Sequence, residues 1–210
     1  RAIGETTVWS AMRRENSLGL LRVRAMQPLI LYHFLFTLGL NAFYEFYPLW
    51  LVERFGFTSV QIGWATVSIT LSMVICSVYA VTVMELRFGA MGSIRRSSLL
   101  LGLAFLLLPL VTETALHPAF VACGAIIAVC NGIFPAYMAN RFEIHGLGRV
   151  QGLLSTNFYV ANVVAALTGS VIALAGTGWA LAGGGVMVLC GSTWLWSFRE
   201  PEPDQGAEAA

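Results

Sequence analysis

The stretch MQPLILYHFLFTLGLNAFYEFYPLWLV, residues 26–52, carries a single charged side chain, Glu45. It is long enough to cross a bilayer as a helix, which takes about 20 apolar residues. Further apolar stretches follow along the whole chain. They cover residues 57–84, 97–112, 119–140, 150–175 and 178–198. The sequence therefore predicts six membrane-spanning helices.

The composition supports this interpretation. Hydrophobic residues make up 57% of the chain and charged residues 11%, whereas a soluble domain carries about 25% charged residues. A soluble core of helices that are apolar all round is the alternative, and six such stretches in succession argue against it. We therefore expect an all-α fold, an integral membrane six-helix bundle.

The basic residues give the orientation. All 12 are arginines, and eleven fall on one side when the six stretches are threaded back and forth across a bilayer. These are Arg1, Arg13, Arg14, Arg22, Arg24, Arg87, Arg95, Arg96, Arg141, Arg149 and Arg199, and only Arg54 falls on the other side. Positive charge in short loops stays cytoplasmic. We therefore expect a multi-pass protein of the cytoplasmic (inner) membrane with both termini inside.

The chain divides into three regions. We expect a cytoplasmic linker at 1–25, a six-span membrane domain at 26–198 and a disordered acidic cytoplasmic tail at 199–210. Predicted inside loops are 85–96 and 141–149, and predicted outside loops are 53–59 and 112–118. The last of these splits the domain into two three-helix repeats. Because the chain begins with arginine rather than methionine, we expect it to be a piece of a longer protein.

The first helix of each repeat carries a proline, Pro48 or Pro135, preceded by an asparagine, Asn41 or Asn131. Interrupted helices at matching places in two repeats mark the substrate pathway of transporters. The alternative is a pair of prolines that the membrane helices simply tolerate.

Small residues recur every four positions on two of the helices. One stripe is Gly124, Ala128, Gly132 and Ala136, and the other is Ala161, Ala165, Gly169 and Ala173. Helices in lipid associate by close backbone approach at small residues. Both stripes are therefore predicted to be helix contact faces.

Glu45 is the most informative polar side chain. An ionised carboxylate inside a membrane helix is costly, and it normally faces protein or a water-filled cavity. Asn41 lies one turn earlier on the same face. The interpretation is a contact for a polar or cationic group of a substrate, or a protonatable gate. The alternative is partial hydration near the outer surface.

Polar residues also line one face of the fifth helix, where Gln151, Ser155, Tyr159 and Asn162 are spaced four, four and three apart. Such a face suits an aqueous cavity, and hydrogen bonding between helices is an equally open alternative. The fourth helix adds Asn131 and Tyr137. His33 is interpreted as a hydrogen-bonded packing residue rather than a proton shuttle. The hydroxyls of the second helix are expected to bond to their own backbone.

Enzyme, metal and nucleic-acid functions are not expected. The sequence has no HExxH, GxSxG or phosphate-loop motif, and its single aspartate, Asp204, lies in the tail. The four cysteines form no CxxC pair and are interpreted as packing residues. The net charge of +1 argues against a nucleic-acid partner. No cofactor is expected.

Three segments resemble the C-terminal six-helix half of a major facilitator superfamily transporter. They are FYEFYPLWLVERFGFTSVQIGW (43–64), NGIFPAYMANRFE (131–143) and GRVQGLLSTNFYVANVVAALTG (148–169). The first is similar to the seventh helix, outer loop and start of the eighth helix, and the others are similar to helices ten and eleven of bacterial drug and tetracycline-type efflux members. The resemblance covers nearly the whole chain.

The loop between the second and third helices departs from the superfamily signature, which is roughly G-x-x-x-D-R-x-G-R-R. Only Arg87 and Gly89 match in register, and Glu85 stands one position before the expected aspartate. Thr82, Leu86, Ala90 and Met91 replace the other signature residues. The signature motifs of proton-coupled exporters belong to the N-terminal half of such proteins, so the mechanism is not readable from this chain.

The resemblance implies part of a secondary active transporter that moves a small molecule by alternating access, with proton-coupled efflux as the expected mode. Its expected partners are the small-molecule substrate, membrane lipids and an N-terminal transporter half. It also implies that the first, second, fourth and fifth helices line the cavity. The expected cavity-lining, substrate-binding residues are Asn41, Glu45, Asn131, Tyr137, Ser155, Tyr159 and Asn162. The alternatives are a half-size transporter that works as a homodimer and a transport-inactive membrane scaffold or sensor.

Overall fold

A computed structural model describes residues 17–197, which form helices and short turns without any strand. The long helices are α2 (Gln27–Phe55), α3 (Ser59–Leu107), α4 (Glu113–Arg141), α5 (Leu147–Ala173) and α6 (Thr177–Ser197). Short 3₁₀ helices are η1 (Ser17–Arg22), η2 (Leu108–Leu110) and η3 (Glu143–His145). All five long helices are long and apolar enough to cross a membrane. The all-α fold class is confirmed, while the predicted tail at 199–210 lies outside the described residues.

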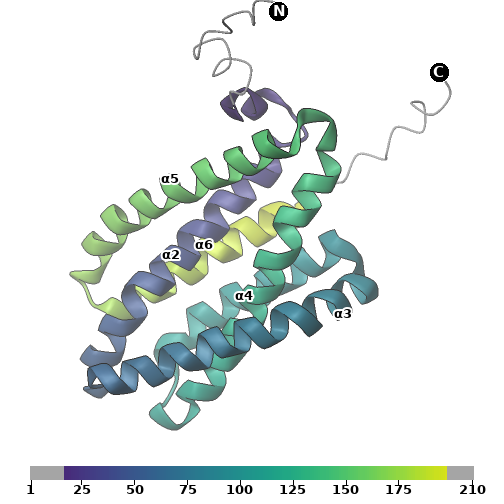
Figure 1. The fold of residues 1–210 in the computed structure, drawn as a ribbon. Helices are drawn as coiled ribbons and strands as arrows, with labels where there is room; N and C mark the ends of the chain where they lie inside the picture. Colours follow the sequence, from purple (N-terminus) through teal and green to yellow (C-terminus); the bar gives the residue numbers. More distant parts are fainter. Residues whose placement is uncertain (1–16, 198–210) are drawn as a thin grey trace, which may run out of the picture.

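Helix α3 contains both the second and the third predicted spans. It folds back on itself at Gly89 (Figure 1), whose φ of 69° and ψ of 168° are not helical. Glycine adopts a positive φ without a Cβ clash, so one residue is enough for the bend. The Ser93 hydroxyl fastens this bend by donating to the carbonyls of Met84 and Gly89, both at 2.7 Å. The predicted inside loop at 85–96 is therefore helical except at the bend.

The other reversals are also shorter than expected. Helix α2 ends at Phe55, and the N–H of the following Gly56 bonds to the carbonyls of Leu51 and Val52. Thr58 then starts α3 with a capping box, in which its backbone N–H donates to the Gln61 side chain at 2.8 Å. Helix α4 already begins at Glu113, so most of the predicted 112–118 loop is helical.

Pro48 and Pro135 lie inside α2 and α4, which continue past them. Of the two interpretations that the sequence leaves open, the continuous backbone favours tolerated prolines over interrupted helices. Neighbouring helices compensate for the lost N–H donor in such cases.

Helix α2 occupies the middle of the bundle. It packs mainly against α6 and α5, while α3 packs against α4 and α6, so α5 and the first part of α3 lie at opposite edges (Figure 1). Phe43 of α2 is fully buried at the centre and stacks on Phe105 of α3, with ring centroids 4.4 Å apart. It also meets the edge of Phe120 of α4 at 6.1 Å. One aromatic side chain of α2 thus joins three helices.

Close backbone approaches hold the helices together. A Cβ added to Gly39 of α2 would overlap the carbonyl oxygen of Gly184 of α6, and one added to Gly124 of α4 would overlap the carbonyl oxygen of Ile69 of α3. The predicted contact stripe on α5 is buried at Ala161, Ala165 and Gly169. On α4, Gly124 and Ala128 are buried, but Gly132 and Ala136 are exposed. In the second half of that stripe, Gly132 still approaches the Val81 side chain of α3, where an added Cβ would lie 2.9 Å from Cγ2.

A carboxylate ties the far end of α2 to the start of α6. Glu53 Oε2 accepts hydrogen bonds from the hydroxyl and the backbone N–H of Thr177, the latter at 3.2 Å. Thr177 is the first residue of α6, where backbone N–H groups have no partner within the helix. Glu53 therefore caps a helix that begins 124 residues later in the chain.

The reversals gather at two ends of the bundle. Helix η1, the Gly89 bend, the α4–α5 turn and the last turn of α6 lie at one end (Figure 1), which we term the arginine end. Its arginines within the described residues are Arg22, Arg24, Arg87, Arg95, Arg96, Arg141 and Arg149. Arg95 links two of these elements by donating from Nε to the carbonyl of Leu195 at 3.1 Å. Arg54 lies at the opposite end. The cytoplasmic side and the two-repeat layout stay predictions.

Gly39→Ala should lower the melting temperature of the detergent-solubilised protein, because the new methyl group collides with the backbone of α6. Overpacking of this kind costs about 1–3 kcal/mol. Gly63→Ala is the matched control, since Gly63 lies in α3 with no atom within 4 Å of an added Cβ. Its melting temperature should stay equal or rise. Equal melting temperatures for the two variants would contradict the close crossing of α2 and α6.

Candidate functional site: an exposed polar face

Helix α5 turns three of its predicted polar residues away from the bundle. Ser155, Tyr159 and Asn162 are exposed, with Tyr159 at 67%. The buried small residues lie on a neighbouring side of the same helix, as the sequence predicts. Exposed hydroxyl and amide groups in an apolar helix need water or another protein surface against them.

Helix α2 contributes Glu45 and Asn41 one turn apart. Glu45 is exposed, and Asn41 is half-buried with no hydrogen-bond partner for its Nδ2 within the described residues. The neighbouring Tyr44 hydroxyl donates to the Met73 sulfur at 3.3 Å, which connects this part of α2 to α3. A buried amide without a partner costs free energy. Asn41 therefore retains a donor for a group that the described residues do not supply.

The two predicted residues of α4 do not share a face. Asn131 is exposed, while Tyr137 is half-buried with the Arg141 guanidinium 5.8 Å from its ring centroid. At 100° per residue they point about 120° apart. Asn131 is the one of the pair that adds to the exposed polar surface.

Helices α2, α4 and α5 meet at a small pocket near the arginine end. Its volume is about 220 Å³. It is lined by His33, Pro135, Gln151, Leu154, Ser155, Phe158 and Tyr159. Ser155 and Tyr159 were predicted cavity residues and Gln151 shares their face. The structure thus brings three polar residues of α5 together with a histidine of α2.

His33 is held in one orientation by its neighbours. Asn157 Nδ2 donates to His33 Nδ1 at 2.8 Å and to the Ile30 carbonyl at 3.3 Å. The imidazole also stacks on Phe134 of α4, with centroids 5.2 Å apart and planes 10° apart. Since Nδ1 accepts, the neutral ring carries its proton on Nε2. The expectation of a hydrogen-bonded packing histidine agrees with this geometry, although His33 also lines the pocket.

Asn157 has no counterpart in the sequence predictions. It points about 160° away from Ser155 around α5, so the polar stripe gave no reason to select it. Its role follows from the contact between α2 and α5. We find no sequence signal that would have identified it.

The predicted residues form two groups rather than one. His33 and Glu45 are twelve residues apart on α2, or about 18 Å along the helix axis at 1.5 Å per residue. The small pocket therefore lies near the arginine end, and Asn41 and Glu45 lie nearer the opposite end. We use the term polar face for the polar residues of both groups taken together. It consists of Asn41, Glu45, Asn131, Gln151, Ser155, Tyr159 and Asn162.

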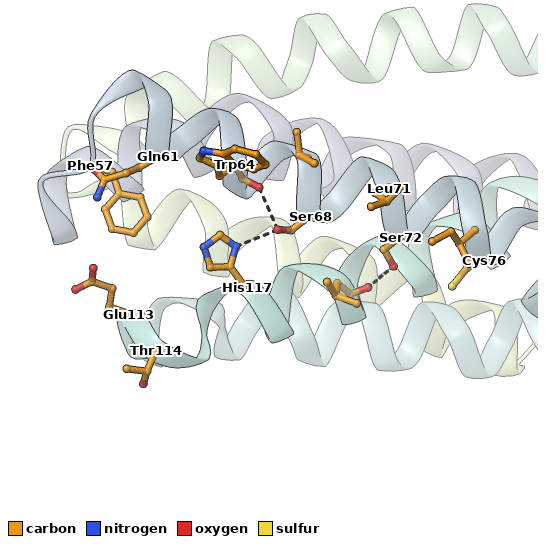
Figure 2. A pocket seen from close by; sticks show the side chains of 13 residues that line it. Phe57, Gln61, Trp64, Ser68, Leu71, Ser72, Cys76, Glu113, Thr114 and His117 are labelled. Carbon is orange, nitrogen blue, oxygen red and sulfur yellow. Dashed lines mark hydrogen bonds between the residues drawn. The ribbon is translucent and has the colours of Figure 1, made fainter.

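A larger groove runs between α3 and α4 (Figure 2), with a volume of about 890 Å³. Ser68 of α3 contacts His117 Nδ1 of α4 at 2.9 Å, and the Ser72 hydroxyl donates to the Val121 carbonyl at 2.6 Å. Thr66 and Thr70 bond to their own backbone as expected. His117 lies in α4, within the segment 112–118 that was predicted as an outside loop. The sequence predictions assigned no role to this groove.

Comparison with known proteins gives one family. The family model described as Major Facilitator Superfamily matches residues 8–210. No curated protein and no solved structure matches the chain.

Cysteines introduced at Ser155 or Asn162 should react with a charged methanethiosulfonate at least ten times faster than a cysteine at Val160, because a thiolate forms only where water reaches it. Val160 is the matched control, since it is also exposed but points about 140° away from Ser155. The parent should carry Cys76→Ser and Cys190→Ser, because both thiols are at least partly accessible. Equal rates at positions 155 and 160 would mean that the polar face does not border water.

Proposed function

Because the chain belongs to the major facilitator superfamily and is thus part of a multi-pass membrane transporter, we propose that it moves a small molecule by alternating access, coupled to protons and directed outward. Members of this superfamily are transporters rather than enzymes, in agreement with the expectation of no catalytic activity. The proposed location is the cytoplasmic (inner) membrane, with the arginine end inside.

The polar face carries this proposal. Glu45, Ser155, Tyr159 and Asn162 are exposed on helices that are mainly apolar. Lipid tails offer such groups no hydrogen bonds, so they belong against a water-filled cavity or another protein surface. Two of the three contributing helices, α2 and α5, pack on each other. The substrate is proposed to bind on this face, in contact with Asn41, Glu45, Asn131, Ser155, Tyr159 and Asn162. Tyr137, which points about 120° away from Asn131 around α4, is the seventh proposed contact.

Alternating access needs a second body that moves against this one. We propose that a second six-helix half covers the polar face, either as an N-terminal transporter half or as a second copy of this chain. The substrate site would then lie between the halves. The tight glycine contacts between α2 and α6 support movement of this bundle as one unit.

The mass of the full-length protein in detergent discriminates between these two partners. A monomer with a further six spans supports the N-terminal half. A defined dimer of six-span chains supports the half-size transporter. A six-span monomer that reconstitutes without any flux would support a scaffold or sensor and contradict transport.

Glu45 is the proposed proton-coupling residue. In alternating access, a carboxylate of a membrane span can face water in one conformation and protein in the other. Water favours its charged form and an apolar protein surface favours its neutral form, so the change of conformation can accompany the uptake or release of a proton. Asn41 stands one turn away with an amide donor that can bond to the charged form. The outward direction rests on the resemblance of residues 131–143 and 148–169 to drug and tetracycline-type efflux proteins.

Glu45→Gln in the full-length protein should reduce proton-driven flux into inverted vesicles at least tenfold and flatten its dependence on pH, because the amide cannot exchange a proton. Glu85→Gln is the matched control, as an exposed glutamate of α3 near the arginine end. It should leave flux within about twofold of wild type. Unchanged flux and an unchanged pH profile in Glu45→Gln would remove Glu45 from the coupling mechanism.

A further inference from the structure

A crevice lies at the end of the bundle opposite the arginine end. Its volume is about 720 Å³, within the range of about 300–1,000 Å³ typical of small-molecule sites. It is lined by the end of α2, the last turn of α3 with η2, and the first turns of α6. The last turn of α3 and helix α6 belong to the third and sixth predicted spans, which the superfamily resemblance does not place around the transport cavity. The crevice is therefore separate from the polar face.

Close helix packing shuts the crevice on the side toward the middle of the bundle. A Cβ added to Gly185 of α6 would lie 2.5 Å from the backbone nitrogen of Leu106 and 2.9 Å from the carbonyl oxygen of Gly102. No space remains between α3 and α6 at that level. Toward the end of the bundle, Leu110 and Trp179 line the crevice and are 73% and 67% exposed. The crevice therefore opens near the membrane surface, where tryptophan is enriched.

One cation and one anion line the crevice. Arg54 makes no ion pair within the described residues, and its guanidinium carbon lies 5.7 Å from the centroid of the Phe55 ring. It is also the single arginine that the sequence places on this side of the membrane, against the usual bias of positive charge. Glu53 uses Oε2 to cap α6, and its Oε1 makes no hydrogen bond within residues 17–197. A ligand in the crevice thus meets one guanidinium and one free carboxylate oxygen.

This pair of charges is complementary to a zwitterion. An anion is attracted by Arg54 but repelled by the neighbouring Glu53 carboxylate, and a cation meets the reverse arrangement. A phosphate binds a guanidinium through charge-assisted hydrogen bonds. An ammonium group with N–H donors bonds to a carboxylate oxygen. A headgroup that carries both groups therefore matches both residues.

The lining becomes apolar with depth. Leu106 of α3 lies one turn before Leu110, and Ala182 of α6 lies one turn after Gly178, so both lie farther into the membrane than the charged pair. Both are half-buried. A ligand that matches the whole crevice has a zwitterionic head at the membrane surface and apolar chains directed toward the hydrocarbon.

We propose that this crevice binds a zwitterionic phospholipid whose headgroup carries a primary ammonium. The phosphate lies at Arg54, the ammonium at Glu53 Oε1, and the acyl chains begin along Leu106 and Ala182. Because binding is measured without transport, the proposal does not depend on the proposed function.

Phosphatidylethanolamine is the probe, and its binding to the full-length protein in detergent should be measured by native mass spectrometry. Arg54→Gln should weaken this binding about fivefold or more, because the phosphate loses a charge-assisted hydrogen bond. The difference between the wild type and Arg54→Gln isolates the binding at the crevice. Unchanged affinity in Arg54→Gln would overturn the proposal.

Phosphatidylcholine tests the ammonium contact, because it has the same phosphate but no N–H donor. It should bind to the wild type about fivefold more weakly than phosphatidylethanolamine, the size expected for an exposed charge pair. In Glu53→Gln the two lipids should bind about equally, while the amide oxygen can still accept hydrogen bonds from Thr177. An unchanged preference in Glu53→Gln would refute the contact between the ammonium and Glu53.

Arg87→Gln is the matched control. Arg87 is also exposed, and its guanidinium carbon lies 5.5 Å from the ring centroid of the next residue, Phe88. This variant should keep the wild-type affinity for both lipids. Equal weakening in Arg87→Gln and Arg54→Gln would mean that arginine charge in general retains the lipid, and it would overturn the site.

Two further ligands test the occupant. Phosphatidylglycerol is anionic, and the part of its binding that depends on Arg54 should be weaker than that of phosphatidylethanolamine. The opposite order would overturn the zwitterionic headgroup. Glycerophosphoethanolamine is the same headgroup without acyl chains, and an excess of it should leave the lipid bound. Displacement of the lipid would indicate a site for soluble phosphate esters and refute a lipid occupant.

Discussion

The absence of water inside a bilayer is the constraint on which the rest of this structure depends. Every backbone N–H and C=O in the hydrocarbon must find a partner within the protein, which leaves helices as the form for a chain this apolar. The reversals between the described helices are short. The second and third spans are joined through Gly89 alone, and Ser93 supplies the hydroxyl that bonds to carbonyls at that bend.

In lipid hydrocarbon the hydrophobic effect does not drive helices together, so their association depends on how closely the backbones approach. A methyl group on either glycine would prevent two such approaches, that of Gly39 to Gly184 and that of Gly124 to Ile69. These contacts use the buried sides of α2, α4 and α6. The polar side chains then fall on the surfaces left over, where Glu45 and Tyr159 are exposed. Packing and the proposed substrate contacts are thus assigned to different sides of the same helices.

Much of this arrangement was predictable from the sequence because its signals are local. Apolar length located the spans, and the spacing of Ala161, Ala165 and Gly169 identified the packing side of α5. The bend at Gly89 was predicted as a longer loop, because Arg87, Arg95 and Arg96 resemble a solvated loop until the backbone angle of one glycine is known. The His33–Asn157 bond and the α3–α4 groove depend on which helices lie side by side. That information is not contained in the periodicity of any single helix.

The cap that Glu53 provides for Thr177 bears on how the bundle assembles. Helices are synthesised in chain order, so α6 follows α3, α4 and α5. The Glu53 carboxylate therefore has no bond to Thr177 until α6 is in place. Until then the end of α2 that lies opposite the arginine end lacks this hydrogen-bonded link, and its surface at Gly39 is not covered by α6. Insertion of α6 brings Gly184 against Gly39 and Thr177 to Glu53 in the same step. Helix α6 is the last of the described helices to be synthesised, so its insertion completes the assembly of the bundle. A chain that ends before Thr177 would lack both the bonds to Glu53 and the contact at Gly39.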